Sequence, residues 1–134
     1  MSTVRALVVE DSMAVFDLIH NSVEKTLGET VTLNHTVTVA SAAKLISEND
    51  YAVIIHNLFL PPWGPESVAS TYKAARGVPI IVISGHPSPN LHRTAIANGA
   101  RMFCSKGDLG KGHFGSIFTQ VLPNIGGESG NNGK

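Results

Sequence analysis

Short runs of apolar residues alternate along this chain with segments whose apolar residues recur at helical spacing. The first run, Val4 to Val9, is interrupted only by Arg5, and similar runs occupy Ala52 to Ile55 and Val78 to Ile83. Continuously apolar strands are typical of parallel sheets, because helices cover both faces of such a sheet. The alternation therefore predicts a strand-helix repeat that is wound into one parallel sheet.

Helix signals separate these apolar runs. Apolar residues recur every three or four positions from Phe16 to Leu27, after Ser12, which can cap a helix, and before Gly28, a residue typical of helix ends. Val31 to Val39 alternates apolar with polar residues, which predicts a half-buried strand near a sheet edge, and Ser41 is expected to cap the next helix. Further helices are predicted over residues 41–49, 66–75, 90–98 and 114–122, and a fifth strand over residues 101–104. The predicted fold class is α/β, a five-stranded doubly wound parallel sheet with five helices.

Composition narrows the class of protein. The 134 residues suit one domain over residues 1–124, followed by a Gly- and Asn-rich disordered tail or linker over residues 125–134. Ten basic and ten acidic side chains leave no net charge, which argues against direct binding to nucleic acid or to an anionic membrane. The sequence shows no membrane span or secretion signal, and Cys104 is its only cysteine, so we expect a cytoplasmic protein without an intramolecular disulfide.

Polar residues stand at the carboxyl ends of four of the five predicted strands. They are Glu10 and Asp11 after the first strand, His56 and Asn57 after the third, Ser84 after the fourth and Lys106 after the fifth. Ligands of parallel sheets bind beyond the carboxyl ends of the strands, so we expect a small polar cluster there. His56 is expected to point away from it, because adjacent strand residues face opposite sides of a sheet.

The chemistry of this cluster points to phosphoryl groups held through a metal. The first strand is not followed by the Gly-rich turn that dinucleotide sites need, nor by a phosphate-binding loop with its lysine. Two carboxylates at that turn would repel phosphate unless a divalent cation lay between them. The sequence thus predicts a site for a hard metal such as Mg²⁺.

Four segments resemble the receiver domains of two-component response regulators, over residues 4–122. They are Leu7 to Ser12 with its acidic pair, Asn57 to Pro61, Pro79 to Gly85 with its terminal serine, and Asn98 to Lys106 with its Gly-Ala and lysine. The resemblance implies a flavodoxin-like fold of the receiver type. It also implies a signalling domain rather than an enzyme.

The resemblance implies roles for particular residues. Glu10, Asp11 and the backbone carbonyl of Phe59 would hold Mg²⁺, Ser84 and Lys106 would bind a phosphoryl group, and Phe103 would be a switch aromatic. It also implies partners: a histidine kinase or phosphotransfer protein, and a downstream protein or output domain. The helix over residues 90–98, the strand over 101–104 and the last helix would form the contact face, which could also support a weak homodimer.

The departure from the family pattern that matters most is Asn57, which stands where the phosphorylated aspartate is found. An amide nitrogen is not a nucleophile, and the loss of a negative charge weakens Mg²⁺ binding. Two interpretations stay open: a pseudo-receiver that is off or works without phosphorylation, or a phosphorylatable regulator carrying an engineered Asp-to-Asn replacement. A more distant alternative is a small flavodoxin-like module that binds a nucleotide or cofactor.

Overall fold

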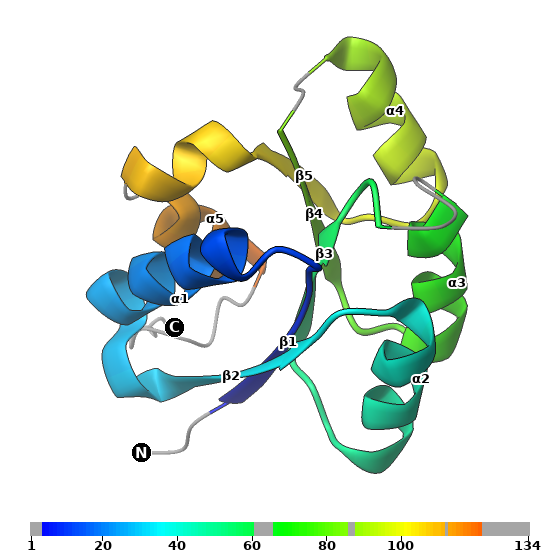
Figure 1. Ribbon diagram of the computed structural model, residues 1–134, viewed down its shortest axis with the longest axis horizontal. Coiled ribbons are helices and arrows are strands. Elements are labelled where there is room, and N and C mark those ends of the chain that lie inside the picture. The colour runs from blue at the N-terminus through cyan, green and yellow to red at the C-terminus, as the bar shows by residue number, and fades with distance from the viewer. Residues whose placement is uncertain (1–3, 61–65, 86–87, 112, 122–134) are drawn as a thin grey trace, which may run out of the picture.

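The computed structural model describes residues 4–60, 66–85, 88–111 and 113–121 as one sheet with helices on both sides (Figure 1). The elements are β1 Val4–Val9, α1 Met13–Leu27, η1 Gly28–Thr30, β2 Val31–Thr36, α2 Val39–Glu48, β3 Val53–Asn57, α3 Glu66–Ala75, β4 Ile80–Ser84, α4 Pro89–Ala97, β5 Met102–Ser105, η2 Lys106–Lys111 and α5 His113–Val121. The strands are parallel and lie in the order β2-β1-β3-β4-β5. This confirms the predicted fold class, whereas the predicted tail lies outside the described residues.

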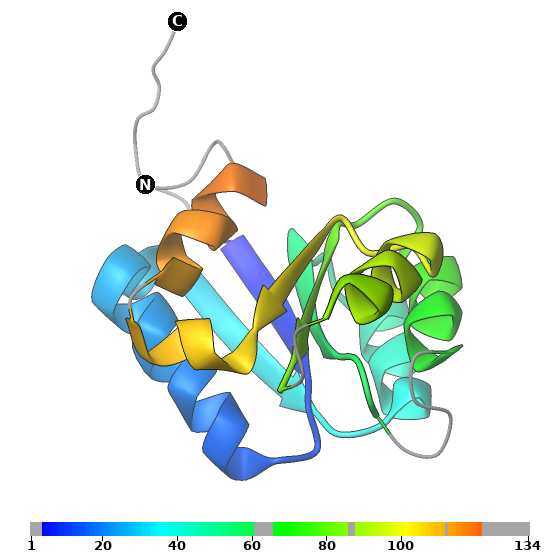
Figure 2. The ribbon, with the colours of Figure 1, turned by 90° about the horizontal axis from the view of Figure 1, so that it is seen from above.

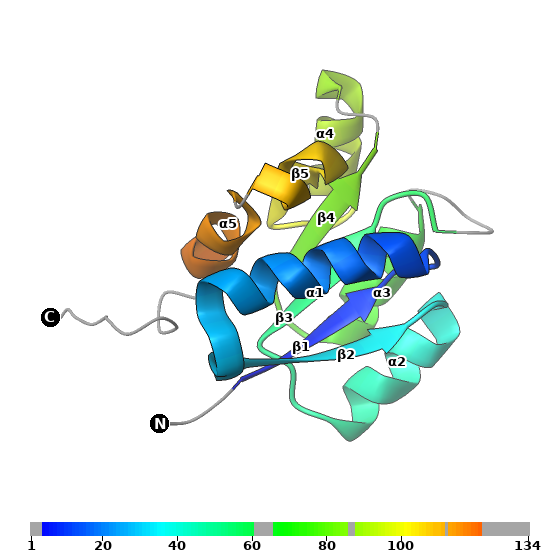
Figure 3. The ribbon, with the colours of Figure 1, turned by 60° about the vertical axis from the view of Figure 1, so that its left-hand side comes forward.

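The helices form two layers. Helices α1 and α5 cover one face of the sheet, and α2, α3 and α4 cover the other, as Figure 2 shows from above and Figure 3 shows with α1 in front. The inner strands alternate between the two layers: Ala6 and Val8 of β1 pack on the α1 side, and Leu7 and Val9 on the α2 side. From Ala6 to Val9, both faces of β1 are therefore apolar and covered, as its apolar run predicts.

Strands β3 and β4 repeat this pattern. All five residues of β3 and all five of β4 are buried, although β3 ends in His56 and Asn57 and β4 in Ser84. The interior thus forces polar side chains to the carboxyl ends of these strands, where hydrogen-bonding partners are within reach.

The connection between β2 and α2 differs from the prediction. Strand β2 ends at Thr36, not at Val39, and the cap of α2 is Thr38, whose side chain accepts a hydrogen bond from the backbone N–H of Ser41 at 3.0 Å. The prediction that Ser41 caps this helix is wrong, because Thr38 offers the same hydroxyl three residues earlier in the extended conformation that a cap needs. Val37 is then exposed, since it no longer belongs to a strand.

The caps of α1 agree with the prediction, and other boundaries shift by small amounts. The Ser12 side chain accepts from the backbone N–H of Val15, and the Gly28 N–H donates to the carbonyl of Glu24 with φ at +57°. Strand β4 begins at Ile80, two residues later than predicted, and β5 spans residues 102–105, one residue later. The short helix η2, which the sequence pattern did not predict, follows β5.

Among the described glycines, Gly99 has the closest neighbouring side chain. Its φ is +114°, and a Cβ atom placed on it would lie 2.4 Å from Cγ of Tyr72 on α3. We expect Gly99→Ala to lower the free energy of unfolding by about 1–3 kcal/mol, because the new methyl group overlaps Tyr72 and the backbone favours glycine. Urea denaturation measures this change.

The double variant Gly99→Ala, Tyr72→Ala separates the two causes. Removing the ring should recover the part of the loss that the overlap causes, when the double variant is compared with Tyr72→Ala alone. Unchanged stability in Gly99→Ala would show that the α3 surface can move away from this turn.

Candidate functional site

The polar cluster lies where the strand order reverses. The chain passes from β1 outward to β2 and returns across β1 to β3, so the loops after β1 and β3 leave the sheet side by side. Here the Asn57 side-chain nitrogen donates to Oδ1 of Asp11 at 3.1 Å and to Oε2 of Glu10 at 3.4 Å. Three of the predicted site residues are thus in direct contact.

Glu10 is the buried member of this cluster. Its side chain is fully buried, and Oε2 accepts a hydrogen bond from the backbone N–H of Ser12 at 3.0 Å. Among the described residues, none hydrogen-bonds to Oε1, which lies 3.9 Å from Nζ of Lys106. Burial raises the pKa of Glu10 to about 6, although the Ser12 hydrogen bond and the Lys106 charge act in the opposite direction.

The orientation of Asn57 is fixed from the loop that follows it. The backbone N–H of Phe59 donates to Oδ1 of Asn57 at 3.3 Å. The side-chain oxygen therefore faces the Phe59 backbone, and the nitrogen faces Glu10 and Asp11. Phe59 thus lies beside the cluster, and its ring is half-exposed.

Lys106 and Ser84 approach from the neighbouring strands. Ser84 is fully buried at the end of β4 and pairs with Ser105 of β5, one residue before Lys106. A Cβ atom on Gly85 would lie 3.7 Å from Cδ of Lys106, so the lysine side chain passes close to this glycine. The Lys106 ammonium group therefore lies near the Glu10 carboxylate, whereas Ser84 lies at the end of β4, the strand beside β5.

Phe103 lies apart from the cluster. Its half-buried ring stacks on His92 of α4, with ring centroids 5.2 Å apart and planes 13° apart. It packs against the core on the α2 side of the sheet. The structure therefore places the predicted switch aromatic between β5 and α4.

His56 points away from the cluster, as the alternation along β3 predicts. It is fully buried, with Nδ1 2.9 Å from the carbonyl oxygen of Asn57 and Nε2 2.8 Å from the Thr71 hydroxyl on α3. The Asn57 carbonyl can only accept, so Nδ1 carries the proton and Nε2 accepts from Thr71. Burial lowers the pKa of His56 to about 4, so the ring is neutral.

Sequence reasoning did not find two supports of the cluster. His35 of β2 hydrogen-bonds through Nε2 to the backbone oxygen of Glu10 at 2.8 Å, and its ring stacks on Phe16 at 4.2 Å. Thr71 holds His56 from α3. The signal for His35 is its place in the register, since Val8 pairs with His35 and the chain then continues to Glu10.

The residues of the cluster fit a divalent cation poorly. A hard cation such as Mg²⁺ takes oxygen ligands in near-octahedral geometry. The cluster has two carboxylates, its amide turns a nitrogen toward both of them, and Lys106 lies near Glu10. Within the described part of the chain, no group of three or more His, Cys, Asp or Glu side chains is placed to hold a metal ion.

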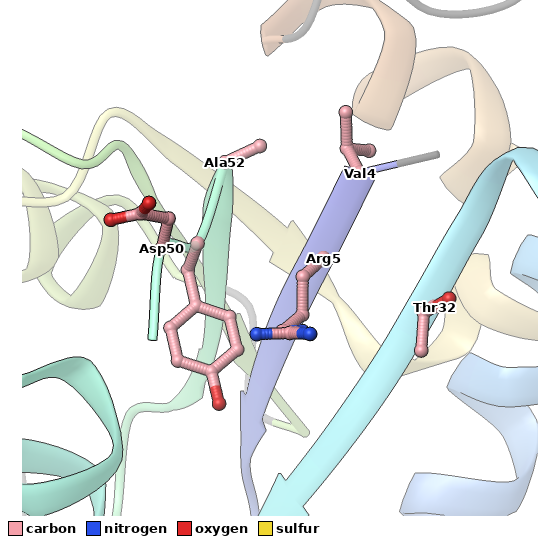
Figure 4. Close-up of a pocket in the computed structure, with 6 residues that line it drawn as sticks. Val4, Arg5, Thr32, Asp50 and Ala52 are labelled. Atoms are coloured by element: carbon pink, nitrogen blue, oxygen red, sulfur yellow. The ribbon is translucent and has the colours of Figure 1, made fainter. Parts of the chain in front are cut away.

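A cavity lies at the opposite end of the strands. Its volume is about 480 Å³, and it opens at the amino ends of β1 and β3 (Figure 4). Its lining residues are Val4, Arg5, Thr32, Asp50, Tyr51 and Ala52. This cavity is therefore separate from the polar cluster.

Comparison with solved structures identifies the fold. The chain is similar to a CheY-like response regulator receiver domain from Methanospirillum hungatei, at 18% identity and TM-score 0.74, covering 91% of this chain and 96% of that one. It is also similar to the phosphorylated cyanobacterial phytochrome response regulator RcpA, at 13% identity and TM-score 0.76, covering 96% and 100%. A response regulator from Burkholderia pseudomallei, with a phosphorylated aspartic acid, calcium ion and citrate, matches at 19% identity and TM-score 0.70, covering 90% and 67%.

The chain has the receiver fold. The order of its strands and the two helical layers are those of the flavodoxin-like architecture that these structures share. No family model and no curated protein sequence matches the chain. Among the helices of the described residues, none is long and apolar enough to cross a bilayer.

The buried His56 makes stability depend on pH. Its pKa is about 4 in the fold and near the ordinary 6.5 in the unfolded chain, so the unfolded chain binds more protons between these values. The His56 contribution is therefore complete above pH 6.5 and is lost as the pH falls toward 4, with a slope of up to about 1.4 kcal/mol per pH unit.

The variant His56→Gln isolates this contribution, because glutamine offers a donor and an acceptor but does not titrate. Urea denaturation is measured at about pH 7 and about pH 5. We expect the free energy of unfolding of the unchanged chain to fall relative to that of His56→Gln at the lower pH. A difference that stays constant would show that the imidazole is not held neutral.

Proposed function

We propose that this chain is a receiver domain of a two-component phosphorelay that signals by protein contact and is not phosphorylated at position 57. The observation that carries the proposal is the contact of Asn57 with Glu10 and Asp11 at the β1–β3 switch point, with Lys106 3.9 Å from Glu10. The receiver fold supports it, because these residues stand where such a fold binds its ligands.

The pocket retains its proposed parts except the nucleophile. Asp11 is exposed beside the buried Glu10. Ser84 ends β4, and Lys106 follows the adjacent strand β5. A hydroxyl and an ammonium group at this edge are suited to bind phosphoryl oxygens. The Asn57 amide cannot attack phosphorus, so the domain is either in an off state or works independently of phosphorylation.

Signalling would use the face formed by α4, β5 and α5. Phe103 lies in this region, half-buried against His92, so a change in its ring position would alter the surface beside α4. The proposed partners are a histidine kinase or phosphotransfer protein and a downstream protein or output domain. A weak homodimer would use the same face.

A second candidate function is a phosphorylatable response regulator whose acceptor aspartate has been replaced by asparagine. The surroundings of Asn57 support it, because its amide contacts Glu10 and Asp11, and Lys106 lies 3.9 Å from Glu10, as a phosphoryl pocket would need. In this case Mg²⁺ would assist the natural aspartate and bind the present chain only weakly.

Restoring the carboxylate tests the proposed function. The chain and its Asn57→Asp variant are incubated with Mg²⁺ and a small phosphodonor, and intact masses are measured. We expect only the variant to gain one phosphoryl group, because it alone has a nucleophile between Glu10 and the Phe59 backbone.

The exposed Asn90 on α4 provides a matched control. Asn90→Asp adds the same carboxylate away from the cluster and should remain unmodified. Phosphorylation of the unchanged chain would contradict the assignment of position 57, and failure of both proteins to react would contradict a phosphoryl pocket.

A further inference from the structure

The Asn57 amide nitrogen lies between two carboxylates. Its distances to Oδ1 of Asp11 and Oε2 of Glu10 are 3.1 Å and 3.4 Å. A primary amide carries two N–H groups, so it can donate one to each carboxylate. The amide thus places an electropositive N–H group between the two acids.

The Asn57 amide cannot rotate by half a turn, so that its oxygen faces a cation, without losing hydrogen bonds. Rotation by half a turn would place Oδ1 against the two carboxylates and the nitrogen against the Phe59 N–H. Acceptors would then face acceptors and a donor would face a donor, and the present bond from Phe59 to Oδ1 at 3.3 Å would be lost. The loop after β3 thus holds the nitrogen side of Asn57 toward the acids.

Burial makes this compensation necessary. Glu10 is fully buried, and a buried carboxylate is destabilising unless donors or opposite charges surround it. Its Oε2 receives the Ser12 N–H and the Asn57 amide, and its Oε1 has Lys106 3.9 Å away. An aspartate at position 57 would replace the donor with a third carboxylate.

We propose that the Asn57 amide takes the place of a divalent cation between Glu10 and Asp11, so that the pocket of this chain keeps its folded arrangement without metal. The inference rests on the proposed function and deepens it, since it assigns a metal-independent state to a receiver-type pocket. Asn57 is then a positioning residue, which holds two carboxylates through hydrogen bonds.

Thermal unfolding with and without Mg²⁺ tests the inference. The chain, Asn57→Asp and Asn90→Asp are each melted in chelator and in excess MgCl₂, at an ionic strength matched with NaCl. We expect the melting temperature of the unchanged chain to be the same in chelator and in MgCl₂, and the same holds for Asn90→Asp. Asn57→Asp should melt lower in chelator, by about 4 °C, and recover with Mg²⁺.

The variant Asn57→Ala separates a lost donor from an added charge. It should also melt lower than the unchanged chain in chelator, because Glu10 and Asp11 lose the amide that joins them. Equal melting of Asn57→Ala and the unchanged chain would overturn the inference. If Asn57→Asp does not fold in chelator, calorimetric titration of the unchanged chain with MgCl₂ still decides, and no binding heat is expected.

The outcomes distinguish this inference from the proposed function. A rise in the melting temperature of the unchanged chain with Mg²⁺ overturns the inference, while phosphorylation of Asn57→Asp would still support the proposed function. An Asn57→Asp variant that is neither destabilised in chelator nor stabilised by Mg²⁺ also overturns it. If that variant, in addition, takes up no phosphoryl group, the proposed function fails as well.

Discussion

The burial of β1, β3 and β4 on both faces is the constraint on which the rest of the molecule depends. A strand that is covered on both sides has no place for a polar side chain except at its ends or beside a specific partner. Glu10, Asn57 and Ser84 stand at such ends, and His56, one residue inside β3, has Thr71 as its partner. The same apolar packing that stabilises the sheet therefore gathers the polar groups at one edge.

Strand order then decides which of these groups meet. Because β1 lies between β2 and β3, the residues after β1 contact both neighbours: the Glu10 N–H donates to the Thr36 carbonyl at 3.0 Å, and the Glu10 side chain meets Asn57. His35 adds a hydrogen bond to the Glu10 carbonyl. Glu10 is thus held through its main chain from β2 and through its side chain from β3, which explains how a carboxylate with a raised pKa keeps one position.

Sequence patterns predicted what depends on burial and missed some features that depend on single hydrogen bonds. The apolar runs predicted the inner strands, and the strand-end rule predicted that Glu10, Asp11 and Asn57 would meet. The end of β2 was misplaced because Val37 and Val39 continue its alternation, and only the Thr38 cap stops it. The orientation of the Asn57 amide could not be predicted either, since it is set by one backbone N–H in the following loop.

Position 57 therefore determines what kind of pocket the fold holds. A carboxylate there is a nucleophile, but it places three carboxylates at one sheet edge, an arrangement that a bound cation would stabilise. An amide of nearly the same shape gives up the nucleophile and supplies two donors to the acids that remain. Under the function proposed above, the exchange of one oxygen for a nitrogen turns a pocket that binds metal and phosphoryl groups into one whose acids are held by the protein's own amide. The same proposal assigns control over the face formed by α4, β5 and α5 to a partner protein rather than to phosphoryl chemistry at the sheet edge.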